Sequence, residues 1–225
     1  MSLPYKIHRP TEAVMLALLA SNCIASYFFY QGFPERVPTH WNFAGEIDGW
    51  SGPGFAAFFF PAMIIGLYLL LTFIPLADPN RNRYEEFGRP YGVLRLSFVL
   101  FMSLIYFIIS FAGLGFDVNV GLIIPFGVGI LFVILGNFMP KFKKNWFVGI
   151  RTPWTMADER VWTQTHRMGG RLFVIGGVLM MLSAVTPPIV NLILLIAVVG
   201  LLTFGTIGYS YWIWRKLQPS TPSDK

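Results

Sequence analysis

Residues Gly136–Arg171 read GNFMPKFKKNWFVGIRTPWTMADERVWTQTHRMGGR and form the one long polar segment between otherwise apolar ones. The segment carries nine charged side chains, which are Lys141, Lys143, Lys144, Arg151, Asp158, Glu159, Arg160, Arg167 and Arg171. An Asp, Lys or Arg at the centre of a bilayer costs roughly 2.5–3.5 kcal/mol, so this stretch cannot lie in hydrocarbon. We therefore expect an aqueous or interfacial loop.

The composition on both sides of this loop is that of an integral membrane protein. Of the 225 residues, 55% are apolar and only 12% are charged, against about a quarter charged in soluble domains. The formal charge of +6 resides in basic residues beside apolar spans, where they orient the chain in a bilayer and do not predict direct nucleic-acid binding. Cys23 is the single cysteine, which excludes an intramolecular disulfide and a thiolate metal cluster.

Six windows are long and apolar enough to cross the membrane, since a helix needs about 20 such residues to do so. They cover approximately residues 12–30, 54–77, 92–116, 119–139, 170–187 and 189–214. We predict an all-α, polytopic membrane protein with six transmembrane helices. Residues 1–91 would form an N-terminal two-helix unit with an extracytoplasmic loop, and residues 92–225 a four-helix unit with the large 136–171 loop.

The basic residues predict how the chain is oriented. Of the 17 Lys and Arg residues, Arg36 alone falls on one side of the predicted spans, and the others, including Lys225 in the C-terminal tail, fall on the opposite side. The positive-inside rule then places both termini and the 136–171 loop in the cytoplasm, with residues 31–53 outside. Arg95, four residues into the third span, is expected to snorkel back to the cytoplasmic headgroups.

The outer loop, VPTHWNFAGEIDGWSGPG from Val37 to Gly54, contains three possible metal ligands within nine residues. These are His40, Glu46 and Asp48, and the neighbouring glycines allow tight turns that would bring them together. The alternative is an aromatic surface in which Trp41 and Trp50 contact a ligand or the bilayer. Both interpretations stay open at this stage.

The inner loop has helical signals in its second half. Thr155 followed three residues later by Asp158 is typical of a helix cap, and a helix over Met156–Met168 would then end at Gly169-Gly170. One face of that helix would carry Trp162, Thr165, His166 and Gly169, which suits a helix lying on the inner membrane surface. A plainer interpretation makes His166 a hydrogen-bonded structural residue.

Ahead of this helix, Pro153 biases Thr152 toward an extended conformation. Neither the inner loop nor the rest of the chain contains a nucleophile–base pair or another recognisable catalytic motif, so we expect neither an enzyme nor a cofactor.

Two motifs resemble those of the SdpI-type family of bacterial membrane proteins. The outer one is Pro38-Thr39-His40-Trp41-Asn42 with Gly45 and Asp48-Gly49. The inner one consists of Gly136-Asn137, Asn145, Gly149-Ile150-Arg151-Thr152-Pro153-Trp154-Thr155, Val161-Trp162 and Thr165-His166-Arg167. The chain departs from the family pattern after Asp48-Gly49, where Trp50-Ser51-Gly52-Pro53 replaces a lysine that is often present.

The resemblance implies a multi-pass protein of the bacterial plasma membrane that protects its producer from a secreted toxin peptide. It also implies signalling, in which the toxin-engaged protein captures a small helix-turn-helix repressor at the cytoplasmic face. The residues that would face the toxin are His40, Trp41, Asn42, Gly45, Asp48 and Gly49. Those that would face the cytoplasmic partner are Asn137, Asn145, Gly149, Arg151, Thr152, Pro153, Trp154, Trp162, Thr165, His166 and Arg167.

Two other functions are compatible with the sequence. A small-solute or ion transporter would use spans one to three and four to six as an inverted repeat, although we expect no span to carry a buried acid of the kind that couples protons. A membrane metal-binding protein would rest on His40, Glu46 and Asp48.

Overall fold

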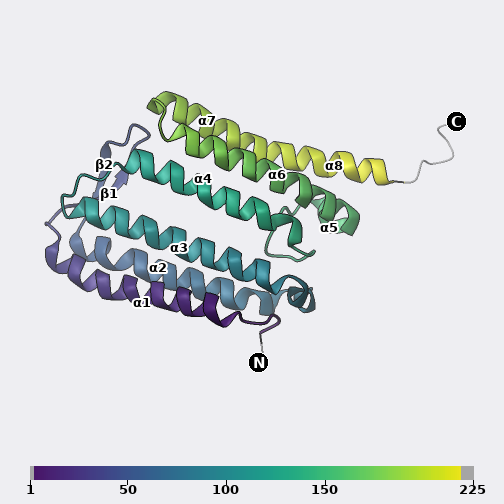
Figure 1. Cartoon of the computed structure of the whole chain (residues 1–225), viewed down its shortest axis with the longest axis horizontal. Coiled ribbons are helices and arrows are strands. Elements are labelled where there is room, and N and C mark those ends of the chain that lie inside the picture. The colour runs from purple at the N-terminus through teal and green to yellow at the C-terminus, as the bar shows by residue number, and fades with distance from the viewer. Residues whose placement is uncertain (1–2, 219–225) are drawn as a thin grey trace.

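The computed structural model describes residues 3–218 as a bundle of long helices with one small β-hairpin (Figure 1). Lys225, which was counted in the charge of the C-terminal tail, lies outside these residues. The helices are α1 (Arg9–Gly32), α2 (Pro53–Phe73), α3 (Gly88–Gly113), α4 (Val120–Phe138), α5 (Pro153–Ala157), α6 (Glu159–Ser183), α7 (Pro188–Gly200) and α8 (Thr206–Leu217). The hairpin pairs β1 (Val37–Trp41) with β2 (Ile47–Ser51) in antiparallel register.

Short helical turns connect several of these elements. The 3₁₀ turns are η1 (Ile74–Ala77), η2 (Arg81–Phe87) and η3 (Met139–Lys141). A π-helical turn, η4 (Leu201–Gly205), joins α7 directly to α8, so that one long helix runs to the C-terminal end of the described chain. The prediction of a helical protein is confirmed, and the hairpin is an addition that the sequence did not predict.

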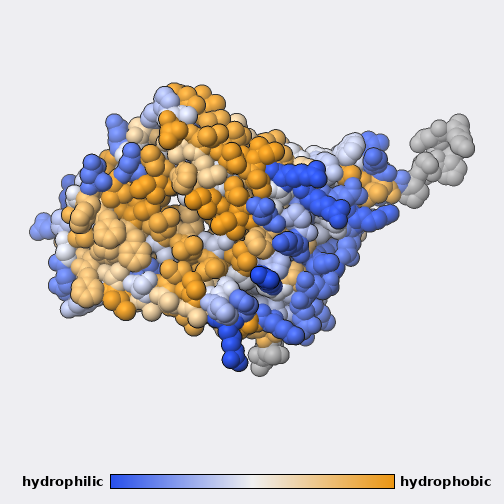
Figure 2. Space-filling view, in the orientation of Figure 1, coloured by the Kyte–Doolittle hydropathy of each residue, from blue (hydrophilic) through white to orange (hydrophobic). Residues whose placement is uncertain are grey.

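Within the described residues 3–218, five helices are long and apolar enough to cross a membrane. They are Arg9–Gly32, Pro53–Ala77, Arg81–Gly113, Val120–Lys141 and Pro188–Leu217, which contain all but one of the predicted windows almost completely. The remaining window, 170–187, lies mostly in α6, whose first three turns are polar. Figure 2 shows the consequence on one face of the molecule, where an apolar band lies between hydrophilic ends and the end near α5 is the more hydrophilic.

The predicted helix stop at Gly169-Gly170 is wrong, because α6 continues through both glycines to Ser183. A Cβ on Gly170 would lie 2.6 Å from the carbonyl oxygen of Gly136 in α4, and one on Gly177 would lie 2.5 Å from that of Gly129. These glycines therefore allow α4 and α6 to pack backbone against backbone, as small residues do between membrane helices. The predicted helix on the membrane surface is in fact the first half of a long helix in the bundle.

The snorkelling prediction for Arg95 is also wrong. Its side chain is 2% exposed, and it pairs with Glu12 in the first turn of α1 at 3.1 Å. A second guanidinium nitrogen donates to the hydroxyl of Thr72 in α2, and the rings of Tyr5 and Tyr68 flank the charge. The first span thus carries a partly buried acid, contrary to expectation, and the buried ion pair connects α1, α2 and α3.

The outer hairpin and the inner loop lie at opposite ends of the helix bundle. α1 begins and α8 ends at the end of the bundle that carries α5, whereas the hairpin lies at the opposite end (Figure 1). α3 packs against α1 and α2 on one side and against α4 on the other. The division of the chain at residue 91 stays a prediction.

Candidate functional site

The outer motif forms the exposed hairpin. His40 and Asp48 stand across the two strands, and the imidazole Nδ1 lies within hydrogen-bonding distance of the carboxylate. Gly49 is opposite His40, where a Cβ would come within 2.7 Å of the histidine Cβ. The motif glycine therefore makes room for the histidine of the facing strand.

Asn42 organises the turn of the hairpin. Its side-chain oxygen accepts hydrogen bonds from the backbone N–H groups of Ala44 and Glu46 at 2.9 and 3.0 Å. Its amide donates to the Glu46 carboxylate at 3.0 Å, and Gly45 completes the turn at a φ of 80°. Trp41 is half-buried, and Trp50 is exposed beside the Arg36 guanidinium.

The structure brings together only part of the predicted metal-ligand set. His40 and Asp48 are adjacent, whereas the Glu46 carboxylate accepts a hydrogen bond from the Asn42 amide. Within residues 3–218, no three His, Cys, Asp or Glu side chains are grouped as a metal site would require.

In the inner motif, Asn145 holds the loop after η3 in shape. It is fully buried, its amide donates to the carbonyls of Lys143 and Val148, and its oxygen accepts from two backbone N–H groups that follow it. Beside it, the buried Asp78 accepts from the Trp146 N–H at 2.9 Å and from the Tyr84 hydroxyl at 3.1 Å. The loop is thereby fixed to the connection between α2 and α3.

Asp78 and Tyr84 were missed by sequence reasoning. Asp78 stands in an Asp-Pro-Asn stretch that is typical of an ordinary turn, and nothing local shows that its carboxylate bonds the chain 68 residues later. The Tyr84 hydroxyl donates to this carboxylate and so joins η2 to the same contact.

His166 is a structural residue, as the plainer interpretation predicts. Its Nδ1 donates to the Trp162 carbonyl at 2.8 Å, and its Nε2 accepts from the Ile150 N–H at 3.0 Å. These partners require the neutral tautomer with the proton on Nδ1. Burial lowers the pKa of the imidazole to about 4. Gly149 lies at a φ of 113°, and a Cβ there would come within 2.3 Å of Nε2.

Trp162, Thr165, His166 and Gly169 share one buried face of α6, as predicted. That face does not meet lipid. The Trp162 indole donates to the Phe142 carbonyl at 2.9 Å and stacks on His166, and Gly169 lies against Ile150 and Met139. The face therefore holds the inner loop against the helix.

The predicted cap, formed by Thr155 with Asp158, is replaced in the structure by two separate helix caps. Thr152 and Thr155 form a reciprocal capping box at the start of α5, and Asp158 separately caps α6 by accepting from the Arg160 N–H at 2.7 Å. Thr152 is extended, as Pro153 predicts, and its hydroxyl donates to Ser210 in α8 at 3.0 Å. Trp154 lies against Tyr211 of the same helix, so α5 is fixed to α8.

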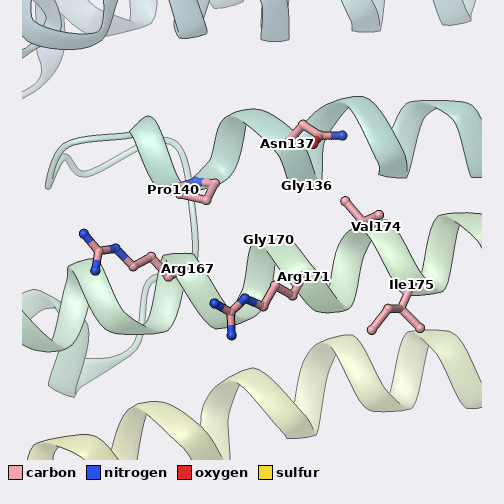
Figure 3. A pocket seen from close by; sticks show the side chains of 8 residues that line it. All are labelled: Gly136, Asn137, Pro140, Arg167, Gly170, Arg171, Val174 and Ile175. Carbon is pink, nitrogen blue, oxygen red and sulfur yellow. The ribbon is translucent and has the colours of Figure 1, made fainter.

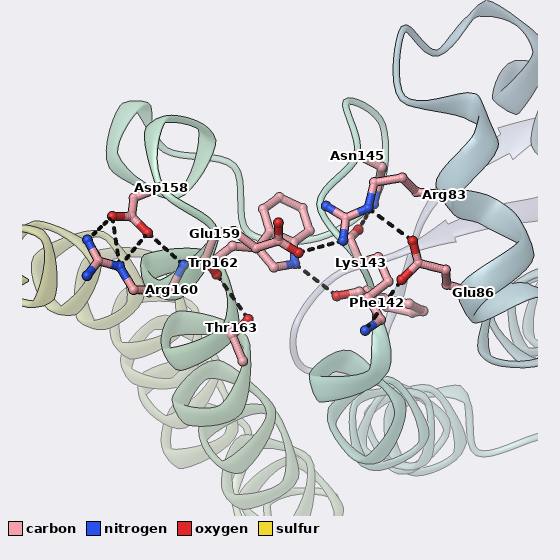
Figure 4. A network of polar contacts seen from close by, with 10 residues as sticks. All are labelled: Arg83, Glu86, Phe142, Lys143, Asn145, Asp158, Glu159, Arg160, Trp162 and Thr163. Carbon is pink, nitrogen blue, oxygen red and sulfur yellow. Dashed lines mark hydrogen bonds and ion pairs between the residues drawn. The ribbon is translucent and has the colours of Figure 1, made fainter.

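A charged rim surrounds this loop (Figure 4). Arg83 in η2 pairs with Glu159 at the start of α6, and Lys143 pairs with Glu86 at 3.6 Å. The Arg83 guanidinium holds the pKa of the Glu159 carboxyl below its usual range. Of the inner motif, the side chains exposed to a partner are Asn137, Arg151, Pro153 and Arg167, and the others are buried, half-buried or glycine.

Comparison with known proteins assigns the chain to a family. A model of the SdpI/YfhL protein family matches residues 141–210, and a model of a domain of unknown function, DUF1648, matches residues 17–65. The chain is 30% identical over 208 residues to the immunity protein SdpI of Bacillus subtilis (strain 168), which covers 92% of this chain and 97% of that protein. No solved structure gives a significant match. The extent of this identity shows that the chain belongs to the SdpI/YfhL protein family.

Proposed function

We propose that this protein is a multi-pass protein of the bacterial plasma membrane that protects its cell against a secreted antimicrobial toxin peptide. The observation that carries the proposal is 30% identity to the immunity protein SdpI across nearly the whole of both chains. The family match over residues 141–210 includes most of the inner loop and the helices that hold it.

The proposed topology has six spans, with α6 as the fifth, and both termini in the cytoplasm. Its support is that α6 lies antiparallel along α4 through paired glycines, so the apolar part of α6 has the same depth as a membrane-capable helix. An even number of crossings also agrees with α1 beginning and α8 ending at the same end of the bundle (Figure 1). The excess of Lys and Arg on the α5 side supports a cytoplasmic location for that end.

In the proposed mechanism, the outer hairpin meets the toxin and the inner loop reports or resists the resulting change in helix packing. The hairpin offers an exposed His40–Asp48 pair and an exposed Trp50. The inner loop offers exposed basic side chains, such as Arg151, to a small helix-turn-helix repressor. A toxin can shift the packing only if it binds two packing states with different affinities.

The test is survival of a toxin-sensitive bacterium that expresses the protein, challenged with an Sdp-type toxin and compared with an empty vector at matched growth. Survival of the expressing strain would support immunity. Killing of both strains, with the protein present in the membrane, would reject immunity to that toxin. Solute-dependent flux in proteoliposomes without protection would instead favour a transporter.

A further inference from the structure

A cavity of about 520 Å³ opens between α4 and α6, at the end of the bundle that carries α5. Its floor is the contact between Gly136 and Gly170, where a Cβ on either residue would lie 2.6 Å from the carbonyl oxygen of the other. The two glycines bring the backbones of α4 and α6 together, and the residues that flank this contact on both helices line the cavity (Figure 3).

Two arginines border this cavity without a counter-charge. Arg167 and Arg171 are both exposed and lie one turn apart on α6. Neither takes part in an ion pair with the residues that the structure describes, whereas Arg83, Arg95 and Arg160 each do. Their side chains extend in the same direction from α6, toward the end that holds Pro140 and away from Val174 and Ile175 (Figure 3).

C-terminal to the two arginines, α6 carries a row of exposed apolar side chains, which we call the apolar track. Ile175, Val178 and Leu182 are 52%, 43% and 59% exposed, and with Arg171 they follow one face of α6 at helical spacing. At 1.5 Å of rise per residue, the track runs roughly 16 Å from Arg171 to Leu182. The face thus changes from cationic at Arg171 to apolar toward the C-terminal end of α6.

We propose that this groove binds an anionic glycerophospholipid, with the phosphate at Arg167 and Arg171 and one acyl chain along Ile175, Val178 and Leu182. Basic pockets between membrane helices on the cytoplasmic side bind anionic headgroups in this way. The order of charge and apolar surface along α6 matches the order within such a lipid, and the length of the track suits an acyl chain. The inference goes beyond immunity and uses the proposed topology only to place the arginines at headgroup depth.

The test is lipid binding to the purified protein in detergent, measured by native mass spectrometry with phosphatidylglycerol and with phosphatidylcholine of the same acyl chains. Two arginines near an anionic headgroup predict roughly a 30-fold preference for phosphatidylglycerol over phosphatidylcholine. The double variant R167Q/R171Q should lose this preference. Arg160→Gln, which removes one charge from an exposed position of the same helix outside the groove, should retain it.

A third variant keeps the inference testable if the double variant does not fold. Asn137→Asp adds a negative charge beside the groove without changing side-chain size, and it should also lower the preference for phosphatidylglycerol. Gel filtration and circular dichroism would establish the fold of each variant. Glycerol 3-phosphate in excess should not displace the lipid, because it lacks the acyl chain.

Three results would overturn the inference: equal binding of both lipids to the wild type, full retention of phosphatidylglycerol by folded R167Q/R171Q or Asn137→Asp, or displacement by glycerol 3-phosphate as efficient as by lipid. Since the readout is lipid binding and not survival, a failure here leaves the test of immunity unaffected.

Discussion

His166 makes the stability of the inner loop depend on pH. Its pKa is about 4 in the folded protein and about 6.5 in an unfolded chain, so between these values only the unfolded chain binds the extra proton. The free energy of unfolding should therefore be highest above pH 6.5 and fall by up to about 1.4 kcal/mol per pH unit as the pH decreases toward 4.

Thermal unfolding in detergent at several pH values would check this expectation. His166→Gln keeps an acceptor for the Ile150 N–H but cannot be protonated, and its unfolding temperature should depend less on pH between 7 and 4.5. His8→Gln, which alters an exposed histidine, should keep the wild-type pH dependence. Parallel curves for the wild type and His166→Gln would contradict the account.

Gly177 tests the backbone contact between α4 and α6. Gly177→Ala places a methyl group 2.5 Å from the Gly129 carbonyl oxygen and 2.9 Å from Val133, so we expect a loss of about 1–3 kcal/mol, which is typical of overpacking. Gly200→Ala is the matched control, because nothing lies within 4 Å of the added methyl. An equal effect of both substitutions on the unfolding temperature would show that the close contact does not contribute to stability.

For individual residues, the sequence predicted which side chains share a helix face better than it predicted their hydrogen-bond and ion-pair partners. The shared face of Trp162, Thr165, His166 and Gly169 followed from helical spacing alone. The acceptor role of the His166 Nε2 did not, because Ile150 reaches it only through the loop that Asn145 and Gly149 shape. Arg95 was placed wrongly because its partner, Glu12, is 83 residues away in the chain.

At the scale of elements, the Glu12–Arg95 pair connects α1 to α3. Removing one member leaves the other charge uncompensated in a buried site, which typically costs about 3–5 kcal/mol. Glu12→Gln should therefore lower the unfolding temperature strongly, and the double variant Glu12→Gln/Arg95→Met should be less affected than Glu12→Gln alone. Arg160→Gln, in an exposed pair, should have little effect.

A double variant at least as unstable as Glu12→Gln would show that the charge pairing is not what stabilises the contact between α1 and α3.

The helices and strands were predicted correctly where apolar length alone defines the element. They were predicted wrongly where contacts with other elements determine its bounds. Four spans and the final long helix followed from apolar length. The end of the inner helix was misplaced because Gly169-Gly170 is a helix breaker in water, whereas here the Gly170 backbone packs on Gly136 in α4. The hairpin was missed because its pairing depends on Gly49 facing His40, which no periodic apolar pattern shows.

At the scale of the whole molecule, the proposed six-span topology can be tested with single cysteines in a Cys23→Ser background. A membrane-impermeant maleimide added to intact cells should label Ala44→Cys in the hairpin and Asp117→Cys between α3 and α4. Val185→Cys decides whether α6 crosses, since it lies between α6 and α7, and it should be labelled too. Ala157→Cys in α5 should react only after permeabilisation, and labelling of Val185→Cys only after permeabilisation would contradict a crossing by α6.

The whole-molecule arrangement was only partly predictable for a physical reason. The charge distribution predicts which loops share a side of the membrane, and the apolar windows predict the order of the spans. Neither predicts that the inner loop is fixed at once to the connection between α2 and α3, to α6 and to α8, through Asp78, Trp162 and Ser210. Those contacts join segments that are far apart in the chain, so no local pattern contains them.

The measurement that tests the central claim most directly is toxin survival of cells expressing the wild type, His40→Ala, Arg151→Ala or Arg160→Gln at equal membrane abundance. We predict that the wild type and Arg160→Gln protect the cells. His40→Ala should lose most protection, because the proposed mechanism has the exposed His40–Asp48 pair meet the toxin. Arg151→Ala should be impaired through the inner loop. Equal protection by all four would contradict a role for either motif, and no protection by the wild type would contradict immunity to that toxin.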